Sequence, residues 1–403
     1  MDKQNTNESK SLVAVARAEA GSGYWARTAG AYTLTFRAFL IALPLFVIVF
    51  MALCAQAFTK NSIYSFAMDL RSVASFVPSD YHDVSYTYVE GERVVCAYRD
   101  GVAVATSDGI EVYSPDGARL LNVPEEWSAP RMSASQKYLV GYDFGTKRFV
   151  VADAYSVLFE GECEFPILHA SVSDTGHFAL VTSSNTHLSQ ILLYDANFRL
   201  IECFSRSSAT TDVAFSPNGK LISFCGIYTE NGVPKSLVQA YRIGAEEPLW
   251  SFSAEELFTQ ISFTDSRHLA LLSDSALRVL DSDGDAVYTL SLENGMATQF
   301  HANEQGVMLV LCTSELHATH RVLLLDEHAD VLLEKTWQGE ILGAAFEEQS
   351  IFLLTEDEIV KSDVQSGEWQ RRSCAKGAST IWAVGENALR VAYAGEALYV
   401  EFD

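Results

Sequence analysis

Short apolar segments alternate with turn residues along most of the chain, from about residue 83 to the C-terminus. Many of these segments end near an Asp, and that Asp recurs at intervals of about 40 residues: Asp116, Asp153, Asp195, Asp281, Asp326, Asp363 and Asp403. The interval between Asp195 and Asp281 is twice as long, and Arg242 stands near the skipped position. A repeat of this period, built of strands and turns without a helical pattern, predicts a β-propeller.

The repeats divide into eight units, each with room for about four strands: 92–127, 131–163, 168–205, 211–253, 258–292, 297–337, 341–374 and 379–403. The last unit supplies only three strands. Asp83–Val89 is predicted to provide the fourth, because ring closure removes exposed sheet edges. The sequence thus predicts an all-β, eight-bladed β-propeller of four-stranded antiparallel blades, with seven blades as the alternative.

An uncharged apolar segment of twenty residues, Phe39 to Phe58, precedes the repeats. As a helix it is long enough to span the hydrocarbon core of a bilayer, about 30 Å. Three Arg residues lie on its N-terminal side, Arg17, Arg27 and Arg37. The positive-inside rule therefore predicts a single-pass signal anchor in the cell membrane, with the N-terminus cytoplasmic and the repeats extracytoplasmic.

Four regions follow from this pattern. Residues 1–36 are predicted to be a mostly disordered cytoplasmic tail, and residues 37–58 a transmembrane helix. Residues 59–82 form a juxtamembrane linker whose apolar residues recur at helical spacing, which predicts a short amphipathic helix. Residues 83–403 form the extracytoplasmic propeller. In an alternative interpretation, Ala55-Gln56-Ala57 is a signal-peptidase site, and cleavage at Ala57 would release a soluble exported domain.

Composition supports a folded domain and narrows the partners. The chain has 403 residues, of which 48% are hydrophobic and 20% charged, as is usual for a globular protein. Its formal net charge is −24. A strongly acidic protein repels phosphate backbones, so nucleic acid is not expected as a ligand.

Three stretches carry a resemblance to known proteins: VVCAYRDGVAVATSDGIEVYSPDGARLL, DVAFSPNGKLISF and ISFTDSRHLALLSDSALRVLDSDGD. They resemble a family of single-span, membrane-anchored, propeller-like proteins of unknown function from Gram-positive anaerobic bacteria. The resemblance implies a location and a fold, and it brings no catalytic residues. The segment Asp363–Trp369 and the strand endings at Trp250 and Trp337 also resemble, more distantly, quinoprotein-type and WD40-like β-propellers.

The resemblance to quinoproteins does not extend to their cofactor site. Those enzymes typically have an adjacent-cysteine disulfide and acidic calcium ligands, and this sequence has no Cys-Cys pair. Only some of the repeats carry the Asp…Gly…Trp pattern. We therefore expect no quinone and no other cofactor.

Two motifs could bind metals but have simpler interpretations. Asp281-Ser282-Asp283-Gly284-Asp285 alternates carboxylates, yet Ala286 and Leu292 stand where an EF-hand loop needs Gly and Glu. A solvated turn is the preferred interpretation. His317 and His320 form an H-x-x-H pair without a CxxC or HExxH motif, so we interpret them as part of a polar loop.

Six cysteines are spread over the repeats, one in each of six units: Cys96, Cys163, Cys203, Cys225, Cys312 and Cys374. A disulfide needs Cα atoms within about 7 Å, which this distribution makes difficult. We expect mostly reduced, buried thiols. Cys163 and Cys203, in neighbouring outer strands, are left as a candidate pair.

Function is expected at one rim of the ring. Loops between the second and third strands share that rim with the connections between blades, and three are long: Thr182–Ser189, Tyr228–Lys235 and Thr313–His320. Long loops often carry binding functions. The candidate binding residues are His187, Tyr228, Asn231, Lys235, His317 and His320.

Three function classes fit this picture. The first is a protein-interaction scaffold or sensor that binds an unknown protein or peptide at the outer face of the membrane. The second is a binding module for a cell-wall glycan or another small ligand, which would need exposed aromatic residues in the rim loops. The third is a quinoprotein-like enzyme, which would need polar side chains converging in the axial funnel. No catalytic signature such as GxSxG is present, so the sequence favours the first class.

Overall fold

The computed structural model describes residues 39–46 and 81–402, except for residues 293–295, 304, 315–318 and 365–366. The chain divides into two compact units, Met1–Lys60 and Asn61–Asp403, which are considered separately. In the first unit, residues 39–46 form a short helix whose large apolar side chains are exposed. The described residues contain no helix with both the length and the apolar character needed to cross a membrane. The predicted tail, most of the predicted span, the Ala57 cleavage site and the predicted juxtamembrane helix lie outside the described residues.

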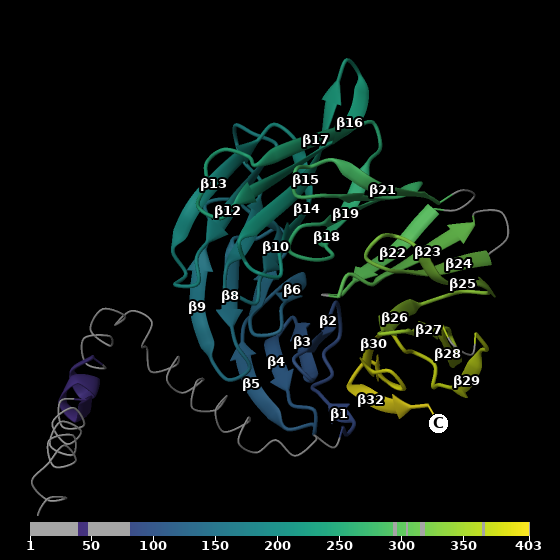
Figure 1. Ribbon diagram of the computed structural model, residues 1–403. Coiled ribbons are helices and arrows are strands. Elements are labelled where there is room, and N and C mark those ends of the chain that lie inside the picture. The colour runs from purple at the N-terminus through teal and green to yellow at the C-terminus, as the bar shows by residue number, and fades with distance from the viewer. Residues whose placement is uncertain are drawn as a thin grey trace, which may run out of the picture. The chain divides into compact units, whose positions relative to one another are not determined.

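The second unit consists of four-stranded antiparallel sheets that follow one another along the chain as blades (Figure 1). Blade 1 contains β2 (Val94–Tyr98), β3 (Gly101–Thr106), β4 (Gly109–Tyr113) and β5 (Arg119–Pro124). Blade 2 contains β6 (Pro130–Ala134), β7 (Leu139–Asp143), β8 (Arg148–Ala152) and β9 (Val157–Glu162). Blade 3 contains β10 (Ile167–Val172), β11 (Phe178–Thr182), β12 (Ser189–Tyr194) and β13 (Leu200–Arg206). Blade 4 contains β14 (Ala209–Phe215), β15 (Leu221–Glu230), β16 (Val233–Arg242) and β17 (Trp250–Ala254).

The remaining blades repeat this order. Blade 5 contains β18 (Phe258–Phe263), β19 (Leu269–Ser273), β20 (Ala276–Leu280) and β21 (Ala286–Ser291). Blade 6 contains β22 (Met296–Ala302), β23 (Met308–Ser314), β24 (Thr319–Leu325) and β25 (Val331–Gln338). Blade 7 contains β26 (Gly343–Glu347), β27 (Ser350–Leu354), β28 (Glu358–Asp363) and β29 (Gln370–Ser373). Blade 8 contains β30 (Thr380–Gly385), β31 (Ala388–Ala392) and β32 (Glu396–Glu401), together with β1 (Val84–Ser85).

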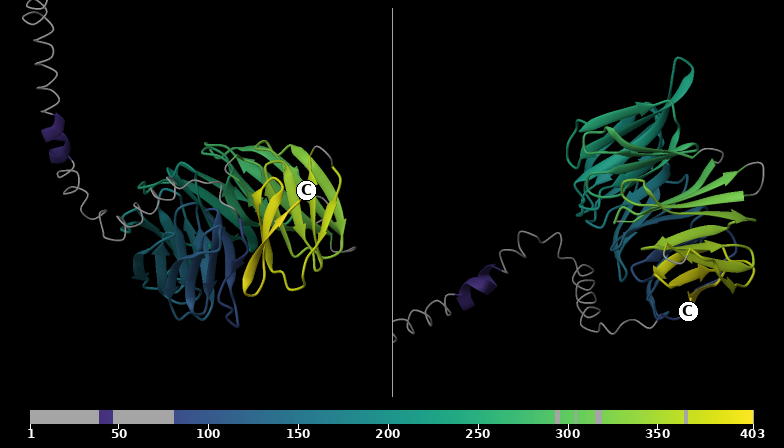
Figure 2. Two further views of the ribbon diagram at one scale, coloured as in Figure 1. Left: turned by 90° about the horizontal axis from the view of Figure 1, so that it is seen from below. Right: turned by 45° about the vertical axis from the view of Figure 1, so that its right-hand side comes forward.

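Blade 8 closes the ring with strands from both ends of the propeller. β1 pairs with β32 in the register Val84 to Ala397 and Ser85 to Glu396. First strands of consecutive blades contact one another, except that β23 contacts β26 between blades 6 and 7. The ring is completed where β30 of blade 8 contacts β2 of blade 1, and the yellow C-terminal blade lies beside the dark blue first blade (Figure 2). The predicted eight-bladed propeller, including closure by a strand from 83–89, is therefore confirmed for the described residues. The closing strand is shorter than the predicted segment.

The core lies between the faces of neighbouring blades. The second strands are buried along their whole length in several blades, as in β3, β7 and β11. The fourth strands instead alternate between exposed and covered positions, as in β17 and β21. A second strand packs both faces against other blades, so its sequence is continuously apolar. Each large apolar side chain buried there contributes about 1.5–3 kcal/mol.

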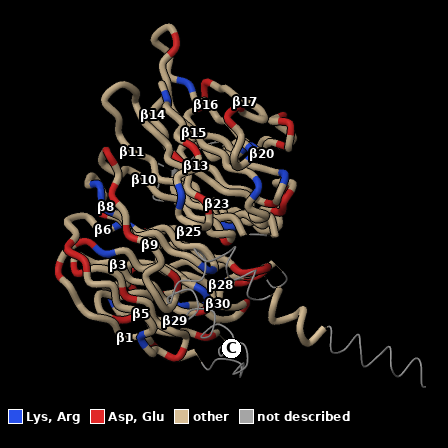
Figure 3. The backbone as a smooth tube through the Cα atoms, turned by 90° about the vertical axis from the view of Figure 1, so that its left-hand side faces the viewer, with Lys and Arg blue, Asp and Glu red and all other residues tan. Residues whose placement is uncertain are grey.

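The recurring Asp has a local role in the turns between third and fourth strands. One carboxylate oxygen accepts backbone N–H groups from the residues two and four positions later in the turns that begin at Asp195, Asp281 and Asp326. Asp binds its own turn in this way because its short carboxylate reaches the following backbone. The predicted turn at Asp281–Asp285 is of this kind. Asp and Glu gather at such loops (Figure 3).

The six described cysteines are all free thiols, so the candidate pair of Cys163 and Cys203 is wrong. Cys163 is buried between blades 2 and 3, whereas Cys203 lies exposed on the outer strand β13. Burial raises the pKa of Cys225 and of Cys312 to about 11. These two are inert thiols of the core.

We expect a maleimide reagent to label Cys203 in the native full-length protein well before Cys225 and Cys312, because only the thiolate of an accessible cysteine reacts. Partial burial raises the pKa of Cys203, so its labelling rate should increase with pH above neutrality. Peptide mapping by mass spectrometry measures this, with Cys203→Ser as the control. Labelling of Cys163 and Cys203 that occurs only after reduction would contradict the prediction.

Candidate functional site

One rim of the propeller carries the loops between second and third strands and the connections between blades. Both are on the same side because the strands of each blade are antiparallel. We call this surface the connection rim. It is formed by the loops 107–108, 144–147, 183–188, 274–275, 355–357 and 393–395 and by the end of one hairpin, 228–235. The described parts of its connections are 86–93, 125–129, 163–166, 207–208, 255–257, 292, 339–342 and 374–379. The opposite side carries the Asp-containing turns and is called the turn rim.

The most prominent part of the connection rim is a hairpin in blade 4. β15 and β16 are each ten residues long, and they pair with each other beyond the point where β14 and β17 end. Their outer ends project from the blade (Figures 1 and 2). Asn231 and Gly232 form the tip with φ values of 54° and 83°. Two consecutive positive φ values are typical of a type I′ turn, for which Asn-Gly is the favoured pair.

Side-chain contacts hold the base of this hairpin. The Tyr228 hydroxyl lies 2.9 Å from Ser253 Oγ on β17. Lys235 Nζ lies 3.0 Å from Glu230 Oε2 and 3.9 Å from Glu255 Oε1. The hydrogen bond and charge of Glu230 raise the pKa of Lys235. The charge of Lys235 is therefore already compensated by carboxylates of its own blade.

One face of the hairpin is directed toward blade 3. The Arg206 guanidinium of blade 3 lies 4.8 Å from the Phe224 ring and donates to Gln239, so this face of blade 4 packs on blade 3. Side chains two residues apart on a strand share a face. Tyr228 and Glu230 therefore continue the face of Phe224, and their cross-strand partners Lys235 and Val233 lie beside them.

The other candidate residues lie in different places. His187 is exposed in the loop 183–188 of blade 3, with Nδ1 2.8 Å from Thr186 Oγ1. His320 lies in β24 of blade 6, with Nδ1 2.9 Å from Thr313 Oγ1, and burial lowers its pKa. His317 lies outside the described residues. The structure thus places His187 and the hairpin residues on adjacent blades, and it separates His320 from them by blade 5.

Exposed apolar side chains are a feature of the connection rim that the sequence analysis missed. Tyr88 is 64% exposed, Phe144 45%, Leu188 60% and Val233 44%. Leu168 and Met296, in the first strands of blades 3 and 6, are also exposed. For Phe144 and Leu188, a position outside the strands was the only signal available in the sequence. Exposed apolar groups that gather on one surface often mark a binding site.

The connection rim is also acidic. Its described residues include thirteen Asp or Glu residues but only four Lys or Arg. Six of these carboxylates form neither a hydrogen bond nor an ion pair with another described residue: those of Glu90, Glu126, Glu164, Asp274, Glu340 and Asp357. On the turn rim, by contrast, Asp195, Asp281 and Asp326 bind the backbone of their own turns. Several carboxylates of the connection rim are therefore not used to stabilise turns, and their negative charge is available to a ligand.

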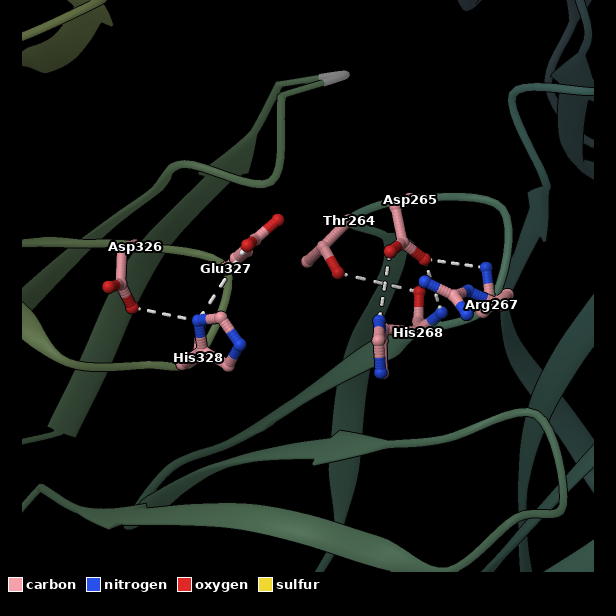
Figure 4. Close-up of polar contacts among 7 residues, drawn as sticks. All are labelled: Thr264, Asp265, Arg267, His268, Asp326, Glu327 and His328. Atoms are coloured by element: carbon pink, nitrogen blue, oxygen red, sulfur yellow. Dashed lines mark hydrogen bonds and ion pairs between the residues drawn. The ribbon is translucent and has the colours of Figure 1, made fainter.

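The carboxylates of the turn rim differ from those of the connection rim because they bind groups within their own turns. Asp265 accepts the backbone N–H groups of Arg267 and His268 at 2.5 and 2.7 Å, and its other oxygen lies 2.9 Å from His268 Nδ1. On the neighbouring blade, Asp326 and Glu327 contact His328 (Figure 4). These contacts lie within single turns. The described residues contain no group of three or more His, Cys, Asp or Glu side chains that could hold a metal ion.

A polar pair in the first strands of blades 3 and 4 also contacts blade 5. The sequence analysis did not identify it. His169 Nε2 of blade 3 lies 3.3 Å from Asp212 Oδ1 of blade 4. Asp212 also accepts the backbone N–H groups of Val213 and, in blade 5, of Ile261, each at 2.8 Å. The first strands of blades 3 to 6 each have a register shift near this level. Asp212 therefore joins blades, and its acceptor oxygens are already occupied.

Two depressions share the lining residues Asp108 and Pro124 of blade 1, and their volumes are about 500 and 290 Å³. The larger one is also lined by Arg148 of blade 2. Glu111 lies in the smaller one, where it accepts hydrogen bonds from Tyr113 at 2.9 Å and Arg119 at 3.0 Å. These contacts fix the side chains that line it. The depressions contain none of the candidate residues.

Residues 80–393 match the sequence profile of a family of unknown function, DUF5711, and the chain belongs to this family. Comparison with curated proteins gives no match. The predicted resemblance to a propeller-like family of unknown function is thus confirmed.

Solved structures with a similar fold include three propellers. BamB from Moraxella catarrhalis has 13% identity and a TM-score of 0.51, over 79% of this chain and 100% of that one. Apo AztD from Citrobacter koseri has 9% identity and a TM-score of 0.52, over 74% and 91%. Sqt1 from Chaetomium thermophilum, bound to the N-terminus of the ribosomal protein L10, has 12% identity and a TM-score of 0.52, over 79% and 100%. At these identities the similarity concerns the fold alone.

Proposed function

We propose that this protein is a membrane-anchored, extracytoplasmic interaction scaffold or sensor whose connection rim binds a protein or peptide. The observation that carries the proposal is the combination, on that one rim, of exposed apolar side chains and carboxylates that are not paired with any other described residue. Burial of apolar surface by a partner contributes about 25 cal/mol of binding free energy per Å². Carboxylates around that surface favour a positively charged partner and restrict its orientation.

Membrane anchoring is supported by the sequence. The uncharged segment Phe39–Phe58 has the length of a membrane span, and Arg17, Arg27 and Arg37 precede it. Such an anchor holds the propeller at the outer face of the membrane with the N-terminus in the cytoplasm. A tethered propeller meets partners at a high effective concentration, which makes modest affinities sufficient.

Binding of a protein partner agrees with what the fold can do. The Sqt1 structure shows a propeller of similar architecture bound to the N-terminus of another protein. In the present chain no catalytic signature was found in the sequence, and the described polar pair near the axis, His169 and Asp212, holds blades together. The observations therefore favour recognition over catalysis.

The test is chemical crosslinking of the full-length protein in intact cells, followed by mass spectrometry of the attached proteins. We expect one specific membrane or exported protein to be recovered. In a variant whose hairpin is shortened by removing residues 228–230 and 233–235, it should be lost, because the projecting part of the rim is removed. The matched control shortens the loop 243–249 of the same blade on the turn rim. Recovery of no specific partner, or equal loss in both variants, would overturn the proposal.

Recognition of a cell-wall glycan or small ligand is the second candidate. It is favoured by two exposed aromatic side chains on the connection rim, Tyr88 and Phe144. The Arg131 guanidinium lies 5.9 Å from the Phe144 ring and is paired with Glu92 at 2.8 Å. An aromatic ring with neighbouring polar groups suits a sugar face. Retention of the protein on isolated cell wall is the measurement that distinguishes this candidate from a protein partner.

A further inference from the structure

We infer that the partner bound by the connection rim presents a positively charged segment with at least one large apolar side chain, and that this segment docks at blades 3 and 4. The docking surface consists of residues 183–188 and 228–235, which we call the hairpin sector. This inference rests on the proposed function, because it names the partner chemistry and the place on the same rim.

The hairpin sector stands above the rest of the rim. A Cβ atom added at Gly226 would lie 2.6 Å from Ser208 Oγ, so the connection between blades 3 and 4 passes directly beside Gly226. The hairpin residues beyond this point extend past the connection. The backbone N–H of Leu188 donates to Arg206 O at 3.0 Å, which fixes the loop of blade 3 on the same side. A partner that approaches the rim therefore meets the side of the hairpin and this loop together.

Two apolar side chains of the hairpin sector are available for contact. Leu188 lies on the blade 3 loop, and Val233 lies on the hairpin face directed toward blade 3. Leu188 is 60% exposed and Val233 is 44% exposed. Apolar anchors surrounded by polar groups are typical of the central part of a protein interface.

The charges of the rim set the sign of the partner. Glu164, in the connection that precedes blade 3, and Asp274, in the loop of blade 5, belong to the blades on either side of the hairpin. Neither carboxylate forms a hydrogen bond or an ion pair with another described residue. The one Lys of the sector, Lys235, is held by Glu230 and Glu255. Two carboxylates thus face one ammonium group at the hairpin, so the sector keeps a negative charge within an acidic rim. Carboxylates on an interface attract Lys and Arg side chains of a partner over about one Debye length, roughly 8–10 Å at physiological salt.

The same charges argue against other occupants. A second copy of this chain carries a formal net charge of −24 and would be repelled at an acidic rim. Phosphate-bearing ligands are disfavoured for the same reason. A cationic protein segment is therefore the occupant that the rim fits best.

The experiment uses purified full-length protein in a neutral detergent and fluorescently labelled peptides, with anisotropy as the readout. The test peptide contains spaced Lys and Leu residues. One control peptide has Glu in place of every Lys, and the other has Ser in place of every Leu. We expect the Lys/Leu peptide to bind at least about tenfold more tightly than either control, and its affinity should fall as salt is added.

Paired variants locate the site. Leu188→Ser with Val233→Ser should weaken the Lys/Leu peptide about fivefold or more, since two apolar anchors are lost. Glu164→Gln with Asp274→Asn should weaken it by a similar factor. The matched controls are Leu200→Ser, an exposed apolar residue on outer strand β13, and Glu246→Gln with Glu247→Gln on the turn rim, none of which should change the affinity.

Three outcomes would overturn the inference. The first is that the Lys/Leu peptide does not bind, and the second is that the Glu/Leu peptide binds equally well. In the third outcome, Glu164→Gln with Asp274→Asn weakens the Lys/Leu peptide no more than the control pair Glu246→Gln with Glu247→Gln does. Failure here is distinguishable from failure of the proposed function. If crosslinking recovers a partner whose attached segment is acidic or uncharged, the scaffold proposal stands and the inference about partner chemistry is wrong. If the attached segment is basic and is lost with the hairpin, both are supported.

Discussion

Replacement of Val84 by Asp is expected to detach the closing strand and to lower the free energy of unfolding by about 3–5 kcal/mol. Val84 is 0% exposed and packs with Tyr86, Val102 and Val104 between blades 8 and 1. A carboxylate placed there would lose its hydration without gaining a partner. Because β1 contains only two residues, detaching it from the sheet should cost less free energy than burying the carboxylate.

The measurement is the urea midpoint of the full-length protein, combined with limited proteolysis of residues 81–93. Val84→Asp should lower the midpoint and expose new cleavage sites in this segment. Ser85→Asp is the matched control, since Ser85 lies in the same strand with its side chain exposed. An unchanged midpoint for Val84→Asp would show that closure by β1 contributes little to stability.

Side-chain contacts compensate for the shortness of the closing strand. The Tyr86 hydroxyl donates to Tyr393 O at 2.5 Å, and Asp83 accepts the backbone N–H of Tyr399 at 2.8 Å. Arg390 is the largest fully buried side chain of the described residues, and it donates to Pro115 O of blade 1 at 2.7 Å. Burial lowers the pKa of Arg390, while the nearby Tyr81 ring stabilises the cation. These contacts join both ends of the ring.

Substitution of Gly109 by Ala is expected to cost about 3 kcal/mol or more. Gly109 begins β4 with φ of 120°, and an added Cβ would lie 1.9 Å from Val123 O on the adjacent strand. The three nearest atoms all belong to the backbone of Val123 and Glu125, so no side-chain rotation can relieve the clash. Relief requires that β4 and β5 move apart, which would break ladder hydrogen bonds in blade 1.

Gly244→Ala provides the matched control. Gly244 also has a positive φ, of 84°, but nothing lies within 4 Å of an added Cβ. Only the conformational cost of about 1–2 kcal/mol is expected there. Thermal midpoints of the two variants, measured under identical conditions, separate the two contributions. Equal shifts in Tm would contradict the steric explanation for Gly109.

The blade plan could be predicted from the sequence because its signals are local. A turn Asp such as Asp195 binds the backbone within its own turn, so its spacing along the chain reports the length of a blade. The closing strand could also be predicted, since a last unit with three strands requires a fourth. Its small extent, Val84–Ser85, could not be predicted, because the contacts of Tyr86, Asp83 and Arg390 that compensate for it join distant parts of the chain.

The candidate site was predictable only in part. The long loop at Tyr228–Lys235 is visible as an extra length between two strand patterns, and its Asn231-Gly232 turn is a local signal. The placement of His187 on the blade next to the hairpin depends on the order of blades 3 and 4 in the ring, which no local pattern encodes. The candidate disulfide between Cys163 and Cys203 failed for the same reason, since one thiol lies inside a blade interface and the other outside it.

By itself, the sequence determined the four-stranded repeat, the number of blades and the acidic character of this protein, since periodicity, turn chemistry and charge are properties of short segments or of their sum. Only the tertiary structure decided which carboxylates are free. The carboxylate of Asp281 accepts backbone N–H groups of its own turn, whereas that of Glu164, in a connection of the other rim, forms no hydrogen bond or ion pair with another described residue. It also decided that Leu188 and Val233 are exposed on adjacent blades. Exposure and pairing depend on which segments the ring brings together, and ring closure is a property of the whole chain.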